Sequence, residues 1–115
     1  EDTHRLIETY FHADRIDVRL AVRQDCIEEE LEGAQHYAET YVELKAEGRN
    51  DWANKYHTMA QDELRHAGVI HDYAVMQIEK LRSVYKPTSD MEEKWDKAHV
   101  EYVDKAAWIK RMLEM

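Results

Sequence analysis

The chain is poor in cysteine, proline and glycine, with one Cys, one Pro and three Gly among 115 residues. The single Cys26 excludes an internal disulfide and a cysteine-based zinc or iron site. No apolar run approaches the roughly eighteen residues that a membrane span requires. The opening residues EDTHRL do not resemble a signal peptide. We therefore expect a single cytoplasmic domain covering residues 1–115, with no membrane partner.

Basic residues are also in the minority, with 16 Lys and Arg against 25 Asp and Glu and a formal net charge of -9. Because a nucleic-acid surface needs clustered basic side chains, we expect no nucleic-acid partner. Charged residues make up 36% of the chain. Together with the shortage of Gly and Pro, this composition is typical of long helices and rare in sheets. The sequence therefore predicts an all-α fold.

Two short breaks divide the helical pattern, EGRND at 47–51 and YKPTSD at 85–90. A period of 3.6 residues on either side of them predicts helices over about 13–46, 52–84 and 90–113. Residues 1–12 either continue the first helix or form a short separate one. We expect four apolar residues of this segment to cover an end of the bundle: Leu6, Ile7, Tyr10 and Phe11.

Helix ends are marked by residues that suit them. Gly48 suits the position after a helix, and Asp51 suits the cap before the next one. Pro87 stops the second helix, while Ser89 and Glu92 form the pattern of a capping box for the third.

Each predicted helix carries one apolar stripe. In the first helix it comprises Ile16, Leu20, Ile27, Leu31, Ala34, Ala38 and Val42. In the second it comprises Trp52, Tyr56, Met59, Glu63, His66, Ile70, Tyr73, Gln77 and Leu81, and in the third Met91, Trp95, Ala98, Tyr102, Ile109 and Leu113.

The first two helices are long, because about thirty-three residues span roughly 50 Å. The shorter third helix cannot cover the whole of such a hairpin. We therefore predict a homodimer or higher homo-oligomer in which two hairpins, each spanning about 13–84, complete a four-helix bundle.

Glu63 and His66 interrupt the apolar stripe of the second helix and need a partner. In an antiparallel pair joined near residue 48, positions i and j are level when i + j is about 96. His66 is then level with Glu30, and Glu63 is level with Gly33. Glu30 shares the inward face of its helix, whereas Glu32 belongs to a polar face and is the competing candidate.

A two-fold copy would double this set to four carboxylates and two imidazoles. Such carboxylates would repel one another and bind protons unless cations lay between them. A pair of iron ions, or of manganese ions, suits six ligands of this kind. The Glu-x-x-His motif itself is weak evidence, since Glu1 and His4 also match it.

The segments ELEGAQHY (30–37) and DELRH (62–66) resemble the two helix signatures of bacterioferritins and rubrerythrins, which have a ferritin-like fold. The resemblance covers about residues 20–80. It implies Glu30 as a terminal metal ligand, Glu63 as a bridging ligand, His66 as a nitrogen ligand and Tyr37 as a neighbour of the ligands. It also implies a di-iron cofactor that oxidises Fe(II) with oxygen or peroxide, followed by iron storage or detoxification.

The third helix departs from these families, because Asp96-x-x-His99 is its nearest approach to a second motif. In this respect the chain resembles half-length encapsulated ferritins, which complete the site between two chains inside a protein shell. The end WIKRMLEM does not resemble a shell-targeting tail. Two other functions stay open: a structural or assembly protein without catalysis, and a di-metal enzyme that oxidises an organic substrate.

Overall fold

The computed structural model describes the backbone of residues 2–115 and the side chains of residues 19–115. Three helices follow one another: α1 (Asp2–Ala46), α2 (Asn50–Val84) and α3 (Ser89–Leu113). The all-α prediction is confirmed for the described residues. Helix α1 begins at Asp2, not near residue 13, so residues 2–12 continue it. The side chains of Leu6, Ile7, Tyr10, Phe11 and Ile16 lie outside the described part.

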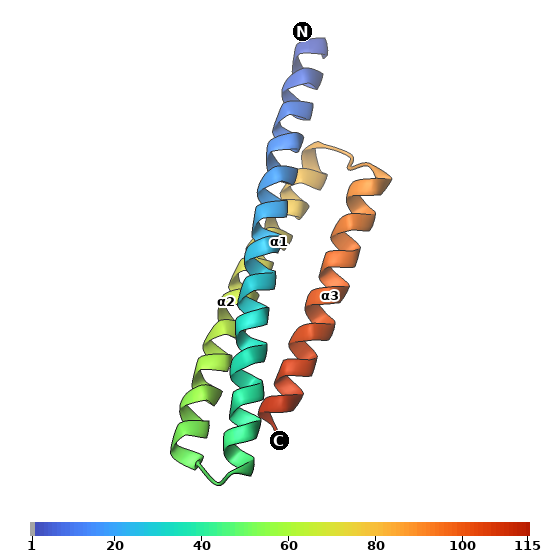
Figure 1. Ribbon diagram of the computed structural model, residues 1–115. Helices are drawn as coiled ribbons and strands as arrows, with labels where there is room; N and C mark the ends of the chain where they lie inside the picture. The colour runs from blue at the N-terminus through green and yellow to red at the C-terminus, as the bar shows by residue number, and fades with distance from the viewer. Residues whose placement is uncertain (1) are drawn as a thin grey trace.

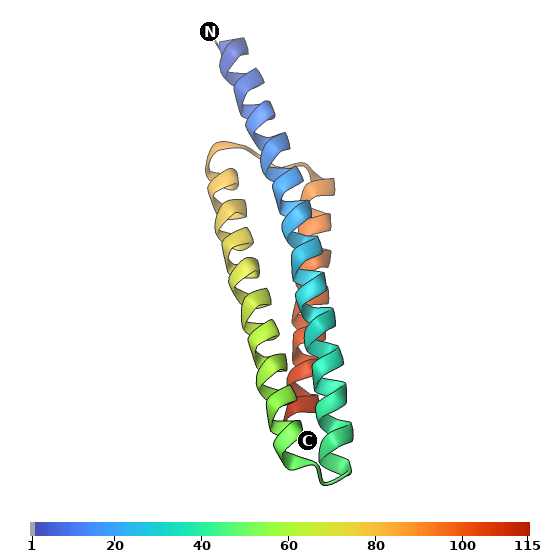
Figure 2. The ribbon, with the colours of Figure 1, turned by 60° about the vertical axis from the view of Figure 1, so that its left-hand side comes forward.

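Helices α1 and α2 form an antiparallel hairpin, and α3 runs back beside α1 (Figures 1 and 2). Gly48 has φ +77°, a conformation that glycine adopts without the steric cost of a Cβ, which lets the chain reverse within three residues. The chain end returns to this turn, where Lys45 Nζ donates to the main-chain oxygen of Met115 at 2.7 Å. Within the described residues, no helix is both long and apolar enough to cross a bilayer.

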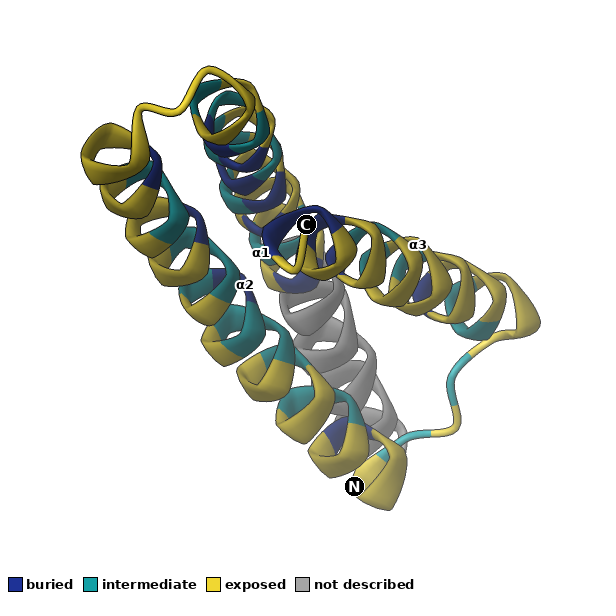
Figure 3. Ribbon diagram, turned by 90° about the horizontal axis from the view of Figure 1, so that it is seen from below, coloured by how far each residue is buried: buried dark blue, intermediate teal, exposed yellow. Residues whose placement is uncertain are grey.

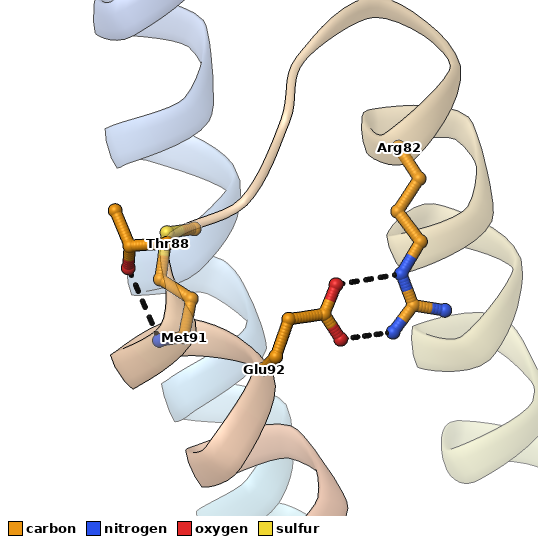
Figure 4. Close-up of polar contacts among 4 residues, drawn as sticks. All are labelled: Arg82, Thr88, Met91 and Glu92. Carbon is orange, nitrogen blue, oxygen red and sulfur yellow. Dashed lines mark hydrogen bonds and ion pairs between the residues drawn. The ribbon is translucent and has the colours of Figure 1, made fainter.

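The predicted capping residues are wrong by one or two positions. Helix α2 begins at Asn50, and its N-cap is Arg49, whose side chain makes no capping hydrogen bond in the described structure. Helix α3 is capped by Thr88, whose hydroxyl accepts from the main-chain nitrogen of Met91 at 3.2 Å (Figure 4). Thr88 has φ −70° and ψ 160°, the extended conformation typical of an N-cap residue.

With Thr88 as the cap, Glu92 lies one position beyond the capping box, and it binds Arg82 across the α2–α3 connection. Arg82 donates to the Glu92 carboxylate from Nε at 3.0 Å and also from Nη2 (Figure 4). The Arg82 guanidinium lowers the pKa of Glu92. This two-pronged pair ties the start of α3 to the end of α2.

Alanines line the contact between α1 and α2. The fully buried or nearly buried members are Ala34, Ala38, Ala53, Ala60 and Ala67, each at most 1% exposed. Buried positions face the other helices, and exposed positions face outward (Figure 3). Because alanine has no side chain beyond Cβ, these positions allow the two helices to approach closely.

The predicted stripe of α2 is therefore offset from the surface that packs on α1. Trp52, Met59 and Tyr73 were expected in the interior but are 58%, 39% and 47% exposed. The stripes of α1 and α3 are largely confirmed, with Leu20, Ile27, Leu31, Trp95 and Ile109 buried. In α2 the prediction is confirmed for Leu81 and wrong for these three residues, because α1 and α2 make contact through alanines that lie one position along from the large side chains.

We call one partly exposed face of α2 the open stripe, and its members are Trp52, Tyr56, Met59, Glu63, His66, Ile70 and Tyr73. They follow alternating spacings of four and three residues, the repeat by which helices pair in coiled coils. Helix α3 reaches α2 elsewhere, at positions such as His57, Gly68 and His71. His71 lies about 140° around the helix from His66. One groove of the hairpin thus holds α3, and the open stripe borders the other.

Candidate metal centre

Glu30 on α1 and Glu63 and His66 on α2 converge on one point of the open groove. One ligand atom from each lies within 4.8 Å of the other two. Among residues 19–115, this is the one group of at least three acidic, histidine or cysteine side chains so arranged. Figure 2 shows the antiparallel hairpin in which α1 and α2 lie side by side.

Chain geometry explains why these three residues meet. The tight turn at Gly48 fixes which residues of α1 and α2 lie side by side near the turn. Because both helices rise by the same distance per residue, the same pairing continues to the middle of the hairpin. His66 Nδ1 lies 3.5 Å from Glu30 Oε2. The Glu63 carboxylate lies over Gly33, where an added Cβ would be 3.6 Å from Glu63 Oε2. A side chain at position 33 would fill the space next to the Glu63 carboxylate, between α1 and α2.

The group is partly shielded from water. The side chains of Glu30 and His66 are 29% and 43% exposed, and Glu63 is half-buried. Glu30 Oε2 is buried and has no hydrogen-bond partner among the described residues. At 3.5 Å, the imidazole is too far for a good hydrogen bond to this oxygen. A buried carboxylate oxygen without a donor is costly unless a cation or a proton reaches it.

The electrostatics of the three side chains also favour a bound cation. The pKa of Glu63 is raised, first because its protonated carboxyl can share a hydrogen bond with Glu30, then because of burial and repulsion from the Glu30 charge. His66 opposes this rise, and Asp62 adds a small further increase. The two carboxylates therefore repel each other when both are ionised, and an added positive charge between them would relieve the repulsion.

The donor set fits a hard or borderline divalent cation. Ligand bonds of about 2.1 Å require donors within roughly 4.2 Å of one another, so shifts of about half an ångström would close the set. Residues 19–115 of one chain bring together three such ligands, which is half of the six predicted from the sequence for a pair of cations.

The remaining sequence candidates lie elsewhere. Glu32 is exposed and borders a groove between α1 and α3 together with Glu28, Glu101 and Asp104, away from the group of three. Tyr37 is half-buried and packs against Tyr56, with ring centroids 6.0 Å apart. Its role as a neighbour of the ligands stays a prediction.

His71 and His99 form a contact that the sequence did not indicate. The structure joins them, with His71 Nε2 and His99 Nδ1 2.9 Å apart, and His71 stacks on Tyr102 at 4.2 Å. The two residues are 28 positions apart on different helices, and the sequence does not predict which residues of α2 and α3 lie side by side. The connection between these helices is less regular than the Gly48 turn.

Comparison with protein-family models, with curated proteins and with solved structures finds no match.

The pH dependence of stability tests the Glu30–Glu63 contact. Since folding raises the pKa of Glu63, this group stabilises the metal-free protein below its ordinary pKa of 4.5, and that stabilisation is lost as the pH rises through the raised value. Glu63→Gln imitates the protonated carboxyl, so at pH 7 its melting temperature should exceed that of the wild type by a few degrees.

The measurement is thermal unfolding by circular dichroism between pH 4 and pH 8, with a chelator present. Glu79→Gln, at an exposed site of the same helix, is the matched control and should follow the wild type. Equal melting temperatures of Glu63→Gln and the wild type at pH 7 would show that the two carboxylates do not repel in solution.

Proposed function

We propose that the protein is a ferritin-like di-iron carboxylate protein whose metal centre forms between two copies of the chain. The observation that carries the proposal is the convergence of Glu30, Glu63 and His66 around a buried carboxylate oxygen that has no hydrogen-bond partner among the described residues. The exposed open stripe around these residues is the surface on which the second copy would lie. Manganese is the alternative metal for the same ligands.

In the proposed dimer, each chain supplies one lone glutamate and one Glu-x-x-His pair. Glu63 would bridge two cations, Glu30 would bind one of them as a terminal carboxylate, and His66 would bind through a ring nitrogen. When bound, the iron pair supplies one-electron oxidation of Fe(II) by oxygen or peroxide. The carboxylates stabilise the higher charge of Fe(III), and Trp52, Met59 and Tyr73 would exclude water on either side.

The proposal also explains the charge of the chain. A net charge of -9 raises the local concentration of cations near the surface. Fe(II) would serve both as substrate and, at the centre, as cofactor. Storage or detoxification of iron follows if dimers assemble further or enter a protein shell.

Metal content tests the proposal directly. After expression with added iron and removal of loosely bound metal, elemental analysis should give about one iron or manganese per chain. Glu63→Ala and His66→Ala should each reduce this to background, since loss of one ligand in three removes most of the affinity of so small a set. Crystals measured at the iron absorption edge would show whether Glu30 or Glu32 binds the metal.

Two exposed residues provide matched controls. Glu79→Ala on α2 and His36→Ala on α1 remove the same side-chain types away from the centre and should keep the wild-type metal content. Stoichiometric Fe(II) added without oxygen, followed by oxygen, should then give ferric absorbance in the wild type and in both controls. Metal-free wild-type protein after iron-replete expression would contradict the proposal.

A structural or assembly protein is the second candidate. The exposed apolar part of the open stripe favours it, because Trp52, Met59 and Tyr73 would support pairing of helices without any metal. A stable dimer that binds no metal and is unaffected by Glu63→Ala would identify this function.

A further inference from the structure

We propose that His71 on α2 and His99 on α3 form a second metal site, which binds one Zn²⁺ ion and clamps α3 onto α2. His71 Nε2 and His99 Nδ1 lie 2.9 Å apart. Two nitrogens bound to one tetrahedral Zn²⁺ at about 2.05 Å are roughly 3.3 Å from each other. An opening of about 0.4 Å between these two atoms would therefore admit the ion in place of their hydrogen bond.

The His71 ring is already oriented for this role. It stacks on the ring of Tyr102, with centroids 4.2 Å apart and planes inclined by 14°. His71 Nδ1 lies 3.3 Å from Asp72 Oδ1. Because an ionised carboxylate only accepts hydrogen bonds, this contact favours the proton on Nδ1 and leaves the lone pair of Nε2 for His99 or a metal. Metal-bound histidines are usually held in this way, with the second ring nitrogen donating to a carboxylate or carbonyl.

Water can complete the coordination of the ion. The side chain of His71 is 16% exposed, and His99 is exposed. A cavity of about 220 Å³ borders both rings, and at roughly 30 Å³ per molecule it has room for several waters. Among the residues whose side chains the structure describes, no third acidic, histidine or cysteine ligand joins this pair. The remaining positions around the ion would therefore be taken by water.

The two ligands favour zinc over the metals of the candidate metal centre. Iron and manganese suit sets that include carboxylates, whereas imidazole alone suits Zn²⁺, Cu²⁺ and Ni²⁺. Cu²⁺ and Ni²⁺ prefer square or tetragonal arrangements, which two rings on separate helices do not provide. Zn²⁺ has no geometric preference from its d electrons, so it accepts two nitrogens and two waters in a tetrahedron.

A bound ion would strengthen a helix contact that has few other links. One end of α3 is tied to α2 by an ion pair near the connection, and the other by His57 Nε2, 3.0 Å from the main-chain oxygen of Leu113. His71 and His99 lie between these two links. Because His71 is about 140° around α2 from His66, the ion would not touch the candidate metal centre. This inference does not rest on the proposed function.

The test is a titration with Zn²⁺ at pH 7.5, followed by ¹H–¹⁵N NMR of the histidine rings. Chelator-treated wild type and Glu63→Ala are both titrated, because Glu63→Ala removes a ligand of the candidate metal centre. His71→Ala and His99→Ala identify the signals by their loss. In both proteins Zn²⁺ should saturably shift the signals of His71 Nε2 and His99 Nδ1, at about one ion per chain for this site.

Affinity for Zn²⁺, measured in the Glu63→Ala background, provides the second arm. His71→Ala and His99→Ala should each weaken binding at least tenfold, and Asp72→Ala, which keeps both ligands, by about tenfold. His36→Ala, at an exposed site of α1, should bind as before. His99→Ala carries the test if His71→Ala does not fold, because His99 is exposed.

Two results would overturn the proposal. One is the absence of a saturable shift at the His71 and His99 rings. The other is equal affinity for Zn²⁺ with and without His99, which would assign the ion to other residues. Because Glu63→Ala disables the candidate metal centre, loss of iron binding there would leave both measurements unchanged.

Discussion

Two glutamates introduced into the open stripe, Met59→Glu with Tyr73→Glu, should convert the protein into a monomer. The two positions flank Glu63 and His66 along α2, and their side chains are 39% and 47% exposed in one chain. In the proposed dimer they would be buried against the second copy. Each dimer would then bury four added carboxylates beside an acidic centre, which we expect to raise the dissociation constant at least a hundredfold.

Sedimentation at micromolar concentration measures this change, with circular dichroism to confirm that the helices persist. Val69→Glu is the matched control, because Val69 is 62% exposed on α2 and lies off the open stripe. The control should remain a dimer. A wild-type protein that is already a monomer at this concentration would rule out the shared centre. A variant that still dimerises would place the interface on another face.

Ala60→Leu should destabilise the hairpin strongly. Ala60 is fully buried in the α1–α2 contact, in the same cluster as Ala34 and Ala38, which are also fully buried. Three added carbon atoms have no space there, so the helices must separate or the leucine must adopt a strained conformation. We expect a loss of about 3 kcal/mol and a melting temperature lower by roughly 10 °C.

Chemical denaturation of the metal-free protein measures this loss. Ala107→Leu makes the same change at an exposed site of α3 and should alter stability by less than about 0.5 kcal/mol. Because separation of α1 and α2 would also pull Glu30 from Glu63, Ala60→Leu should weaken metal binding as well. A variant as stable as the wild type would show that the alanine contact is looser than the structure indicates.

Several features of the fold follow from local rules and could be read from the residues. Helices α1 and α2 end at Ala46 and Val84, just before Gly48 and Pro87, as the sequence predicts. The sequence left open whether residues 1–12 continue the first helix, because the residues around position 12 give no clear signal for or against continuation, and the structure shows that residues 2–12 do continue it. The N-cap of α3 was predicted one position too late, because Ser89 and Thr88 both suit an N-cap and the structure uses Thr88.

The relation between Glu30, Glu63 and His66 was also predictable from the sequence. A short turn and a constant rise per residue place His66 level with Glu30 and Glu63 level with Gly33, and both contacts occur. Whether these residues bind metal, and whether a second chain completes the set, remain the predictions tested above.

The sequence by itself determined the helices, their order and the levels of residues along the hairpin, because helix rise and turn length are local properties. The tertiary structure decided which face of α2 meets α1 and where α3 lies. Those choices depend on packing summed over the whole contact, where a row of alanines allows a closer approach than Trp52, Met59 and Tyr73 would. That packing leaves Glu63 and His66 on an open face, joins His71 to His99, and leaves a cavity beside Trp95.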